Sequence, residues 1–398
     1  MCAAAAGSLL AACSTPAAAP TTAPANAGGA AQATTGAAQA TTGAAQGTSG
    51  GAQATTGGAQ GTTGAAQATT SAAAANAAPA ATSGALDSVI VGASSIIASA
   101  GLFVGMDRGY FKDQGLDINY QVITSQDDSL PLIATGKMDI GNGTIDAFMV
   151  NAVNTGVNIR MVAGQASYTP GHGTLALVVG KNLYDSGQIR TLADLKGRKI
   201  AVPVVAGGGE IVLDKALQQV GLTTKDVDLS QLAIPNMPAA LQNGALDVVE
   251  PAEPVVTQIA DQGIGTIMMY SDKMYPNMES TQWVFSPQFA SGRSDVGVRF
   301  MVGLLKGARD FNAAFSTGKD KDDIVRILSA YTAVKDPALY DKMQLSALSP
   351  NGQLDASNMQ DQVDWLVQHG YAKQPLDVSN LIDLSFAQQA VSQIGSAQ

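Results

Sequence analysis

Residues 116–149 read LDINYQVITSQDDSLPLIATGKMDIGNGTIDAFM, and this stretch decides the fold class. In residues 116–123 every second side chain is apolar, which predicts a strand with one buried face. Residues 129–135 then predict a short helix, residues 138–140 a second strand and residues 144–154 a second helix with apolar side chains on one face. Strands and helices that alternate in this way are typical of an α/β fold.

The same alternation extends in both directions along the chain. Residues 88–106 predict a buried strand, a polar loop and a first helix, and residues 199–270 predict a second series of strands and helices. Helices are expected almost throughout the end of the chain, at residues 295–316, 320–332, 336–343 and 357–369. Short parallel strands with crossover helices form doubly wound sheets. We therefore predict two α/β lobes, each a doubly wound sheet, with a helical C-terminal extension on lobe one.

The first 86 residues differ from the rest of the chain. All 54 charged side chains, 22 of them Lys or Arg and 32 Asp or Glu, lie at or after Asp87, and the first aromatic residue is Phe103. A segment without large or charged side chains cannot offset the entropy of ordering its backbone. A heptapeptide close to Gly-Ala-Ala-Gln-Ala-Thr-Thr recurs over residues 30–71. Residues 14–86 are therefore predicted to be a disordered tether.

The first 13 residues form an apolar segment that ends in Leu10-Ala11-Ala12-Cys13. This ending resembles the lipobox of bacterial lipoproteins, in which the cysteine is acylated. We expect residues 1–13 to be a lipoprotein signal and Cys13 to carry the lipid anchor. No Lys or Arg precedes the apolar run, so the true start is expected further upstream. The alternative is an alanine-rich start with an incidental cysteine.

The composition narrows the possible functions. A net charge of −10 disfavours nucleic acid as a partner. His172 and His369 are the only histidines, and Cys2 and Cys13 are the only cysteines, which leaves little material for zinc sites or for His- and Cys-based catalysis. We therefore expect no metal, no cofactor and no enzymatic activity.

Six phrases in the chain occur in an order that resembles one family, the solute-binding proteins of nitrate, sulfonate and taurine ABC importers and their thiamine-pyrimidine-binding relatives. The phrases are 105–117 (GMDRGYFKDQGLD), 132–139 (LIATGKMD), 192–200 (LADLKGRKI), 213–222 (LDKALQQVGL), 240–247 (ALQNGALD) and 253–254 (EP). The resemblance implies a periplasmic-binding-protein fold of type II. Lobe one would be residues 87–173 plus 280–398, and lobe two residues 174–279.

The same resemblance implies a function. The chain would be a monomeric, lipid-anchored, extracytoplasmic protein of a bacterium that captures a small molecule between its lobes by hinge closure. It would deliver that molecule to an ABC permease and its ATPase. Two alternatives stay open: a sulfonate or nitrate binder of the same fold, and a biosynthetic enzyme related to the thiamine-pyrimidine proteins.

The candidate binding residues are polar or small residues in loops that follow the predicted strands, because ligands of doubly wound sheets bind beyond the carboxyl ends of the strands. These candidates are Ser94, Ser95, Asn142, Thr144, Tyr168, Gly208, Gly209, Glu210, Asn236, Glu250, Glu253 and Trp283. Each has a structural alternative. Asn142 and Thr144 could cap a helix, Glu253 could interact with a helix dipole, and Trp283 could be a core residue.

The charge of these loops bears on the ligand. The loops assigned to the cleft contain eight acidic residues and one basic residue, whereas a buried sulfonate or nitrate normally calls on a guanidinium or ammonium group. We therefore favour a neutral or cationic heterocycle, such as an aminopyrimidine. It would stack on Tyr168 or Trp283. Glu210, Glu250 or Glu253 would accept hydrogen bonds from its N–H groups.

Overall fold

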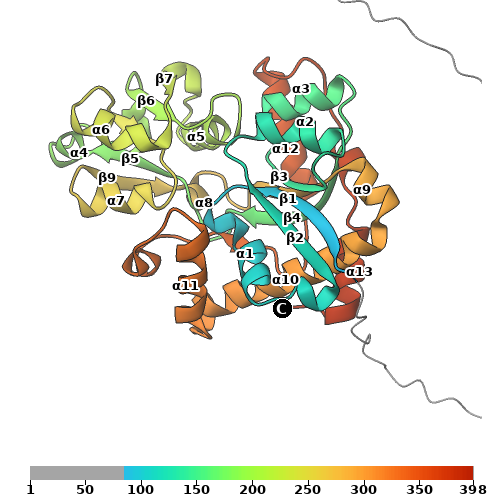
Figure 1. The fold of residues 1–398 in the computed structure, drawn as a ribbon. Coiled ribbons are helices and arrows are strands. Elements are labelled where there is room, and N and C mark those ends of the chain that lie inside the picture. The colour runs from blue at the N-terminus through green and yellow to red at the C-terminus, as the bar shows by residue number, and fades with distance from the viewer. Residues whose placement is uncertain (1–84, 398) are drawn as a thin grey trace, which may run out of the picture. The chain divides into compact units, whose positions relative to one another are not determined.

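The computed structural model describes residues 85–397, which fold into two α/β lobes (Figure 1). Lobe one contains a six-stranded sheet with the order β11-β4-β10-β3-β1-β2, and lobe two a five-stranded sheet with the order β7-β6-β8-β5-β9. The chain passes between the lobes at residues 168–175 and 271–278. The predicted two-lobed α/β fold is confirmed. The predicted signal, tether and Cys13 anchor lie outside the described residues.

Lobe one is built from two separate parts of the chain. Its strands are β1 (Asp87–Ala93), β2 (Leu116–Val122), β3 (Ile140–Gly143), β4 (Arg160–Ser167), β10 (Glu279–Phe285) and β11 (Ala347–Leu348). Its helices are α1 (Ala100–Asp107), α2 (Gln126–Ala134), α3 (Ala147–Asn154), α9 (Pro287–Gly292), α10 (Ser294–Thr317), α11 (Lys321–Tyr331), α12 (Ala356–Gln368) and α13 (Ser385–Ile394). Of the helices expected after Arg293, that at 336–343 is only a short 3-10 turn.

Lobe two is a continuous segment. Its strands are β5 (Ala176–Gly180), β6 (Lys199–Val202), β7 (Asp228–Gln231), β8 (Val248–Val249) and β9 (Gly265–Tyr270). Its helices are α4 (Lys181–Asp185), α5 (Gly208–Gln218), α6 (Met237–Gln242) and α7 (Val255–Asp261), and α8 (Ser271–Met274) lies in the return connection. Short 3-10 helices occur in both lobes at Ile97–Ser99, Lys112–Gln114, Leu192–Leu195, Thr224–Asp226, Ile234–Asn236, Pro337–Asp341 and Val378–Leu381.

Both sheets are mixed, whereas the sequence predicted parallel strands. β1 runs parallel to β2 and β3, and β6 runs parallel to β7 and β8. In contrast, β10 runs antiparallel to β3 and β4, and β5 antiparallel to β8 and β9. The chain enters lobe two through β5 and returns to lobe one through β10. Each of these strands therefore begins at the edge of its sheet where the neighbouring strands end. Strand direction therefore follows from the crossings between lobes, which a local residue pattern does not encode.

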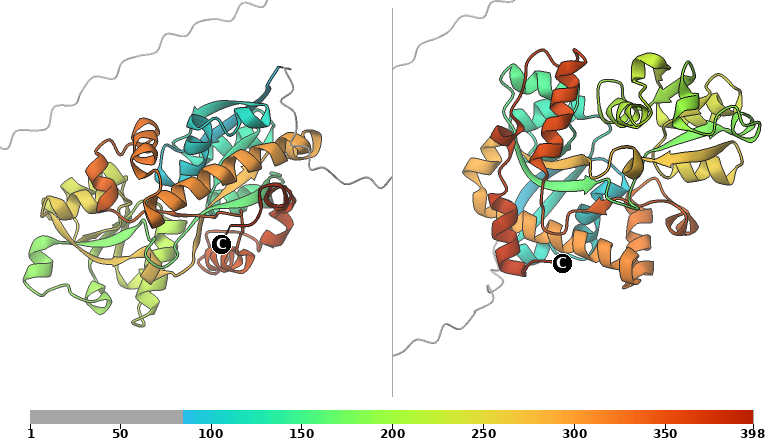
Figure 2. Two further views of the ribbon diagram at one scale, coloured as in Figure 1. Left: turned by 90° about the horizontal axis from the view of Figure 1, so that it is seen from below. Right: turned by 180° about the vertical axis from the view of Figure 1, so that it is seen from behind.

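The core of lobe one depends on the close packing of α1 against α10, the long helix that Figure 2 shows running across this lobe. Phe103 on α1 and Phe300 on α10 are fully buried. A Cβ atom at Gly307 would lie 2.1 Å from the carbonyl oxygen of Gly101, so only glycine allows this approach. Within residues 85–397, none of the helices is both long enough and apolar enough to cross a bilayer.

Candidate functional site

A cavity of about 340 Å³ lies between the two lobes, a size that suits a small organic molecule. Lobe one contributes Ile96, Ile97, Ala98, Thr144, Ile145, Asp146, Ser280, Thr281, Gln344, Ser346 and Gln362. Lobe two and the connecting segments contribute Tyr168, Thr174, Leu175, Pro203, Val204, Gly208, Gly209, Ala252, Glu253 and Met278.

The cavity lies at the carboxyl ends of strands from both lobes, as the sequence predicted. Ile96–Ala98 follow β1 and Thr144–Asp146 follow β3 in lobe one. Pro203–Gly209 follow β6, and Ala252 and Glu253 follow β8, in lobe two. The ends of buried strands therefore deliver loops from both sheets to one site.

The two lobes touch each other beside the cavity. The backbone N–H of Ala147, at the start of α3, donates to the carbonyl oxygen of Ala206 in lobe two at 2.9 Å. Along the same side, Nε1 of Trp365 on α12 donates to Oδ2 of Asp214 on α5 at 2.8 Å. These bonds join α5 and the loop before it to α3 and α12 of lobe one, so the two lobes are in direct contact here.

Asp146 is one of two charged residues among those that line the cavity. It is the N-cap of α3, where its Oδ1 accepts the backbone N–H of Met149 at 2.8 Å. Its Oδ2 accepts Nε2 of Gln126 at 2.9 Å. Burial raises the pKa of Asp146 to about 6, because removal from water penalises the charged form. The capping role that the sequence suggested for Asn142 or Thr144 thus belongs to Asp146.

Glu253 is the other charged lining residue. Its Oε1 accepts the Thr257 hydroxyl at 3.0 Å, the Tyr270 hydroxyl at 3.2 Å and the backbone N–H of Gln344 at 3.3 Å. Burial raises its pKa, and these hydrogen bonds partly oppose that shift. Because Gln344 belongs to lobe one, Glu253 connects the lobes at the cavity wall.

A third acidic residue, Glu250, lies directly behind the wall. It is fully buried, and neither carboxyl oxygen has a hydrogen-bond partner among the described residues. A Cβ atom at Gly209 would lie 3.0 Å from its Oε2, so the carboxyl group lies close to the backbone of a residue that lines the cavity. Burial raises the pKa of Glu250 well above its usual value. The wall therefore adds a neutral carboxylic acid to an already acidic site.

Half of the predicted binding residues lie at the cavity. Those that line it are Thr144, Tyr168, Gly208, Gly209 and Glu253, and Glu250 lies behind it. Tyr168 is buried and lines the cavity, so a ligand there could contact it, as the predicted stacking requires.

The remaining predicted residues do not line the cavity, and the two largest require correction. Trp283 is 3% exposed on β10 and packs edge-on against Phe300, so it belongs to the core of lobe one. Glu210 already accepts the Ala206 N–H at 2.8 Å and the Tyr371 hydroxyl at 3.0 Å. Neither residue lines the cavity, so Trp283 is not placed to stack on a ligand there and Glu210 is not placed to accept from one.

The four other predicted residues, Ser94, Ser95, Asn142 and Asn236, also lie outside the cavity lining. Ser94 and Ser95 follow β1, where the Ser95 hydroxyl is 3.1 Å from the hydroxyl of Tyr120. Asn142 lies inside β3 and pairs with β10. Asn236 is exposed on the 3-10 turn before α6.

The sequence missed several lining residues, above all Gln362 and Gln344. Gln362 lies on the buried face of α12 beside Met359, Val363 and Leu366. An amide within an apolar helical stripe is a signal that could have identified it. Gln344 lies in an irregular segment, where no periodicity marks its position.

Neither histidine faces the cavity, and both rings bond to backbone. Nδ1 of His172 is 2.9 Å from the carbonyl oxygen of Leu345, and Nδ1 of His369 is 2.8 Å from that of Trp365. Within residues 85–397, no group of three or more His, Cys, Asp or Glu side chains is placed to hold a metal ion.

Comparisons with known proteins agree on one family. A family model described as NMT1/THI5 like matches residues 97–314. A candidate binding protein of Brucella abortus is 20% identical over 286 residues, which cover 69% of this chain and 83% of that protein. YtlA of Bacillus subtilis, another candidate binding protein, is 24% identical over 262 residues, 61% of this chain and 76% of that protein.

Solved structures of periplasmic binding proteins share the fold. The periplasmic aliphatic sulphonate binding protein SsuA from Escherichia coli matches with a TM-score of 0.62 and 16% identity, over 76% of this chain and 99% of that one. The periplasmic nitrate-binding protein NrtA from Synechocystis PCC 6803 matches with a TM-score of 0.61 and 12% identity, over 78% and 89%. At these identities the likeness concerns the fold, and the ligand has to be argued from the cleft itself.

Proposed function

Because the chain belongs to the NMT1/THI5-like family, we propose that it is the extracytoplasmic solute-binding component of an ABC importer. It captures a small molecule between its lobes and delivers it to a permease. The fold it shares with SsuA and NrtA supports this role. So does a cavity to which both lobes contribute, since hinge closure can then enclose the solute.

The ligand we propose is a neutral or cationic small molecule, plausibly a flat heterocycle of the aminopyrimidine type. One observation carries this choice: the charged residues that line the cavity, Asp146 and Glu253, are both acidic. An anion would have no guanidinium or ammonium group among the lining residues to receive it. A cation or a donor-rich heterocycle would instead meet carboxyl groups that can accept its N–H bonds.

The site has one feature that favours an anion, the amino terminus of α5. Gly208 and Gly209 line the cavity there, and free backbone N–H groups attract negative charge. However, the carboxyl groups of Asp146 and Glu253 line the same cavity. In their ionised forms these carboxylates would repel an anion, so the acidic lining outweighs the helix terminus.

The alternative of a biosynthetic enzyme would require reactive groups in the cavity. A pyridoxal cofactor would need a lysine amine to hold it covalently. The lining residues include no lysine, histidine or cysteine. The binding function therefore fits these side chains better than covalent chemistry.

The proposal includes a membrane anchor. Acylation of Cys13, followed by an uncharged spacer of some 70 residues, would hold the binding lobes close to the permease. Replacement of Cys13 by Ser should release the protein from the membrane fraction. Continued membrane association without acyl incorporation would contradict the anchor and leave the binding function untouched.

Calorimetric titration tests the ligand class. We expect 4-amino-2-methylpyrimidine or a related cationic heterocycle to bind with a dissociation constant on the order of micromolar or tighter. Taurine, methanesulfonate and nitrate should give no heat of binding. Tight binding of one of these anions, without a response to heterocycles, would refute the ligand class. The transport role would survive that result.

A further inference from the structure

Helix α12 places the side chain of Gln362 at the cavity. The nitrogen of its amide already donates hydrogen bonds within the protein, whereas the oxygen has no partner in the described part of the chain. Gln362 is fully buried and lines the cavity. Its Nε2 donates to the carbonyl oxygen of Glu279 at 3.1 Å and to Oδ1 of Asn358 at 2.9 Å. Its Oε1 is buried and has no hydrogen-bond partner among the described residues.

The backbone fixes the orientation of this amide. The N–H of Glu279, which can only donate, donates to Oδ1 of Asn358 at 3.0 Å, so that atom must be an oxygen. The Gln362 amide therefore faces two acceptors, the Asn358 oxygen and the Glu279 carbonyl. A flipped amide would bring a third oxygen against these two. Oε1 is consequently the end that is left without a partner among the described residues.

Glu279 also holds α12 itself in place. Its Oε1 accepts the backbone N–H of Asp355, the N-cap residue of this helix, at 3.1 Å. With the bonds to Asn358 and Gln362, three contacts thus join the first residue of β10 to the first two turns of α12. Since Met359 and Leu366 are fully buried on the same helix, Gln362 has little freedom to move.

We propose that Gln362 is a specificity-determining residue whose amide oxygen accepts a hydrogen bond from the bound solute. The cleft then selects solutes that carry an N–H or O–H donor on the edge facing α12. This inference rests on the proposed function, in which the cleft binds a neutral or cationic heterocycle. Thr281 on the same lobe also lines the cavity, and its hydroxyl is buried without a partner among the described residues, so it is a second candidate polar group for the solute.

The test compares two solutes that differ in one group, 4-amino-2-methylpyrimidine and 2,4-dimethylpyrimidine. Calorimetry on the full chain should show that the wild type prefers the amino compound by about tenfold or more, because the methyl compound leaves a buried acceptor unpaired. Gln362→Met keeps the length of the side chain and removes the acceptor. In this variant the two affinities should differ by no more than about twofold, mainly through weaker binding of the amino compound.

Asn358 supplies a matched pair of variants in which Gln362 is intact. Asn358→Asp retains an acceptor for the Glu279 N–H and for Gln362, so the preference for the amino compound should persist. Asn358→Leu removes the oxygen that orients the amide, and the preference should fall. A general loss of stability would weaken the binding of both pyrimidines equally, so the ratio reports orientation. If Gln362→Met does not fold, the comparison of the two Asn358 variants still tests the role of the amide oxygen.

The outcomes separate this inference from the proposed function. Equal binding of both pyrimidines by the wild type, or an unchanged preference in Gln362→Met and Asn358→Leu, overturns the role of Gln362 and leaves the heterocycle cleft standing. Tight binding of nitrate or methanesulfonate, with no response to either pyrimidine, overturns the ligand class and this inference with it. A wild type that binds no probe counts against both.

Discussion

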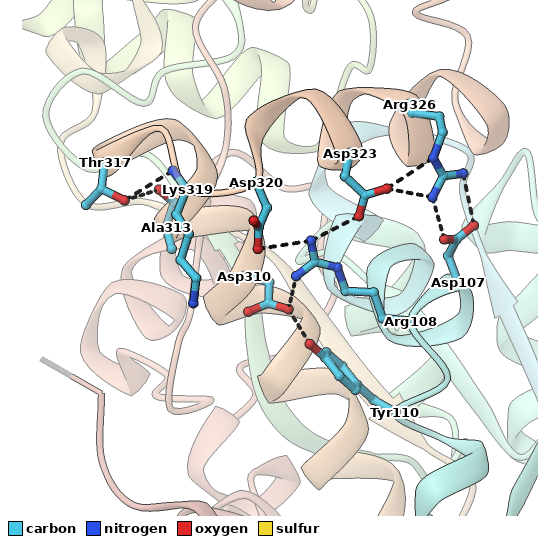
Figure 3. A network of polar contacts seen from close by, with 10 residues as sticks. All are labelled: Asp107, Arg108, Tyr110, Asp310, Ala313, Thr317, Lys319, Asp320, Asp323 and Arg326. Atoms are coloured by element: carbon cyan, nitrogen blue, oxygen red, sulfur yellow. Dashed lines mark hydrogen bonds and ion pairs between the residues drawn. The ribbon is translucent and has the colours of Figure 1, made fainter.

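Two groups of acidic residues, one beside α11 in lobe one and the other at the cleft, have opposite surroundings. Where α1, α10 and α11 meet, the acidic groups are paired with arginine (Figure 3). Nη1 of Arg108 lies 2.6 Å from Oδ2 of Asp310, and Nη2 lies 3.0 Å from Oδ2 of Asp323. Arg326 pairs with Asp107 at 2.7 Å.

The cleft has acids without cations. Asp146, Glu250 and Glu253 form no ion pair with any residue in the described part of the chain, and burial raises the pKa of each one. The acids beside α11 thus have arginine partners. In the cleft, Asp146 and Glu253 accept hydrogen bonds from neutral donors only, and Glu250 has no partner among the described residues. We infer that the first region serves stability and that the second gives up stability for binding.

The largest effect is expected when the paired region is broken. Arg108→Met should lower the free energy of unfolding by about 2 kcal/mol, since it leaves Asp310 and Asp323 close together without their shared cation. Arg326→Met is the matched control. Its side chain is 57% exposed, so solvent screens its ion pairs and the loss should be clearly smaller than for Arg108→Met. Urea unfolding measures both, and equal losses would mean that the partly buried position of Arg108 has no special weight.

The cleft should respond in the opposite direction. Glu250→Met replaces an unpartnered buried acid with an apolar side chain of similar length and should raise the free energy of unfolding by about 1–2 kcal/mol. Glu253→Met is the control, because it removes bonds to Thr257, Tyr270 and Gln344 and should be destabilising. Thermal denaturation distinguishes them. A loss of stability in Glu250→Met would show that its carboxyl group has a structural role.

The smallest effect is the pH dependence that the unpaired acids produce. Burial raises the pKa of Asp146 to about 6 and that of Glu279 to about 7. Between pH 4 and 7, approximately, the folded chain therefore binds more protons than the unfolded chain, and the free energy of unfolding falls as the pH rises. We expect a loss of about 1–2 kcal/mol between pH 6 and pH 8.

The paired acids provide the contrast for this measurement. Asp295 and Asp323 have pKa values below the usual range because arginine bonds favour their charged forms, so their contribution is lost only in stronger acid. An Asp146→Asn, Glu279→Gln double variant should flatten the decline between pH 6 and pH 8. Chemical denaturation at several pH values checks this. An unchanged decline in the double variant would assign it to other groups.

The sequence predicted the lobes better than the details of the cleft. Strand and helix alternation placed both sheets, and the amphipathic pattern located α10, α11 and α12 closely. At the site, Tyr168, the glycines at the start of α5 and Glu253 line the cavity as expected. Trp283 was misplaced because the sequence predicts it in a loop after a strand, whereas β10 begins at Glu279 and carries the indole into the core.

Residues of α12 were missed for a different reason. Gln362 reaches the cavity only because α12 packs against the start of β10, about 80 positions earlier in the chain. Its amide orientation depends on the N–H of Glu279 and on Asn358 together. A helical pattern shows that the position is buried, and it contains no information about the strand beside it.

The sequence by itself determined the features that depend on neighbouring residues and on composition: two α/β series, a charge-free first segment and an excess of acids in the loops between strands. Hydrophobic periodicity and charge are local properties, so they can be read without a fold. The tertiary structure decided which acids are paired and which are buried without partners. It also set the direction of β5 and β10 and the end of the Gln362 amide that is left without a partner within residues 85–397. Each of these depends on contacts between residues far apart in the chain, whose distances only the folded arrangement of the lobes defines.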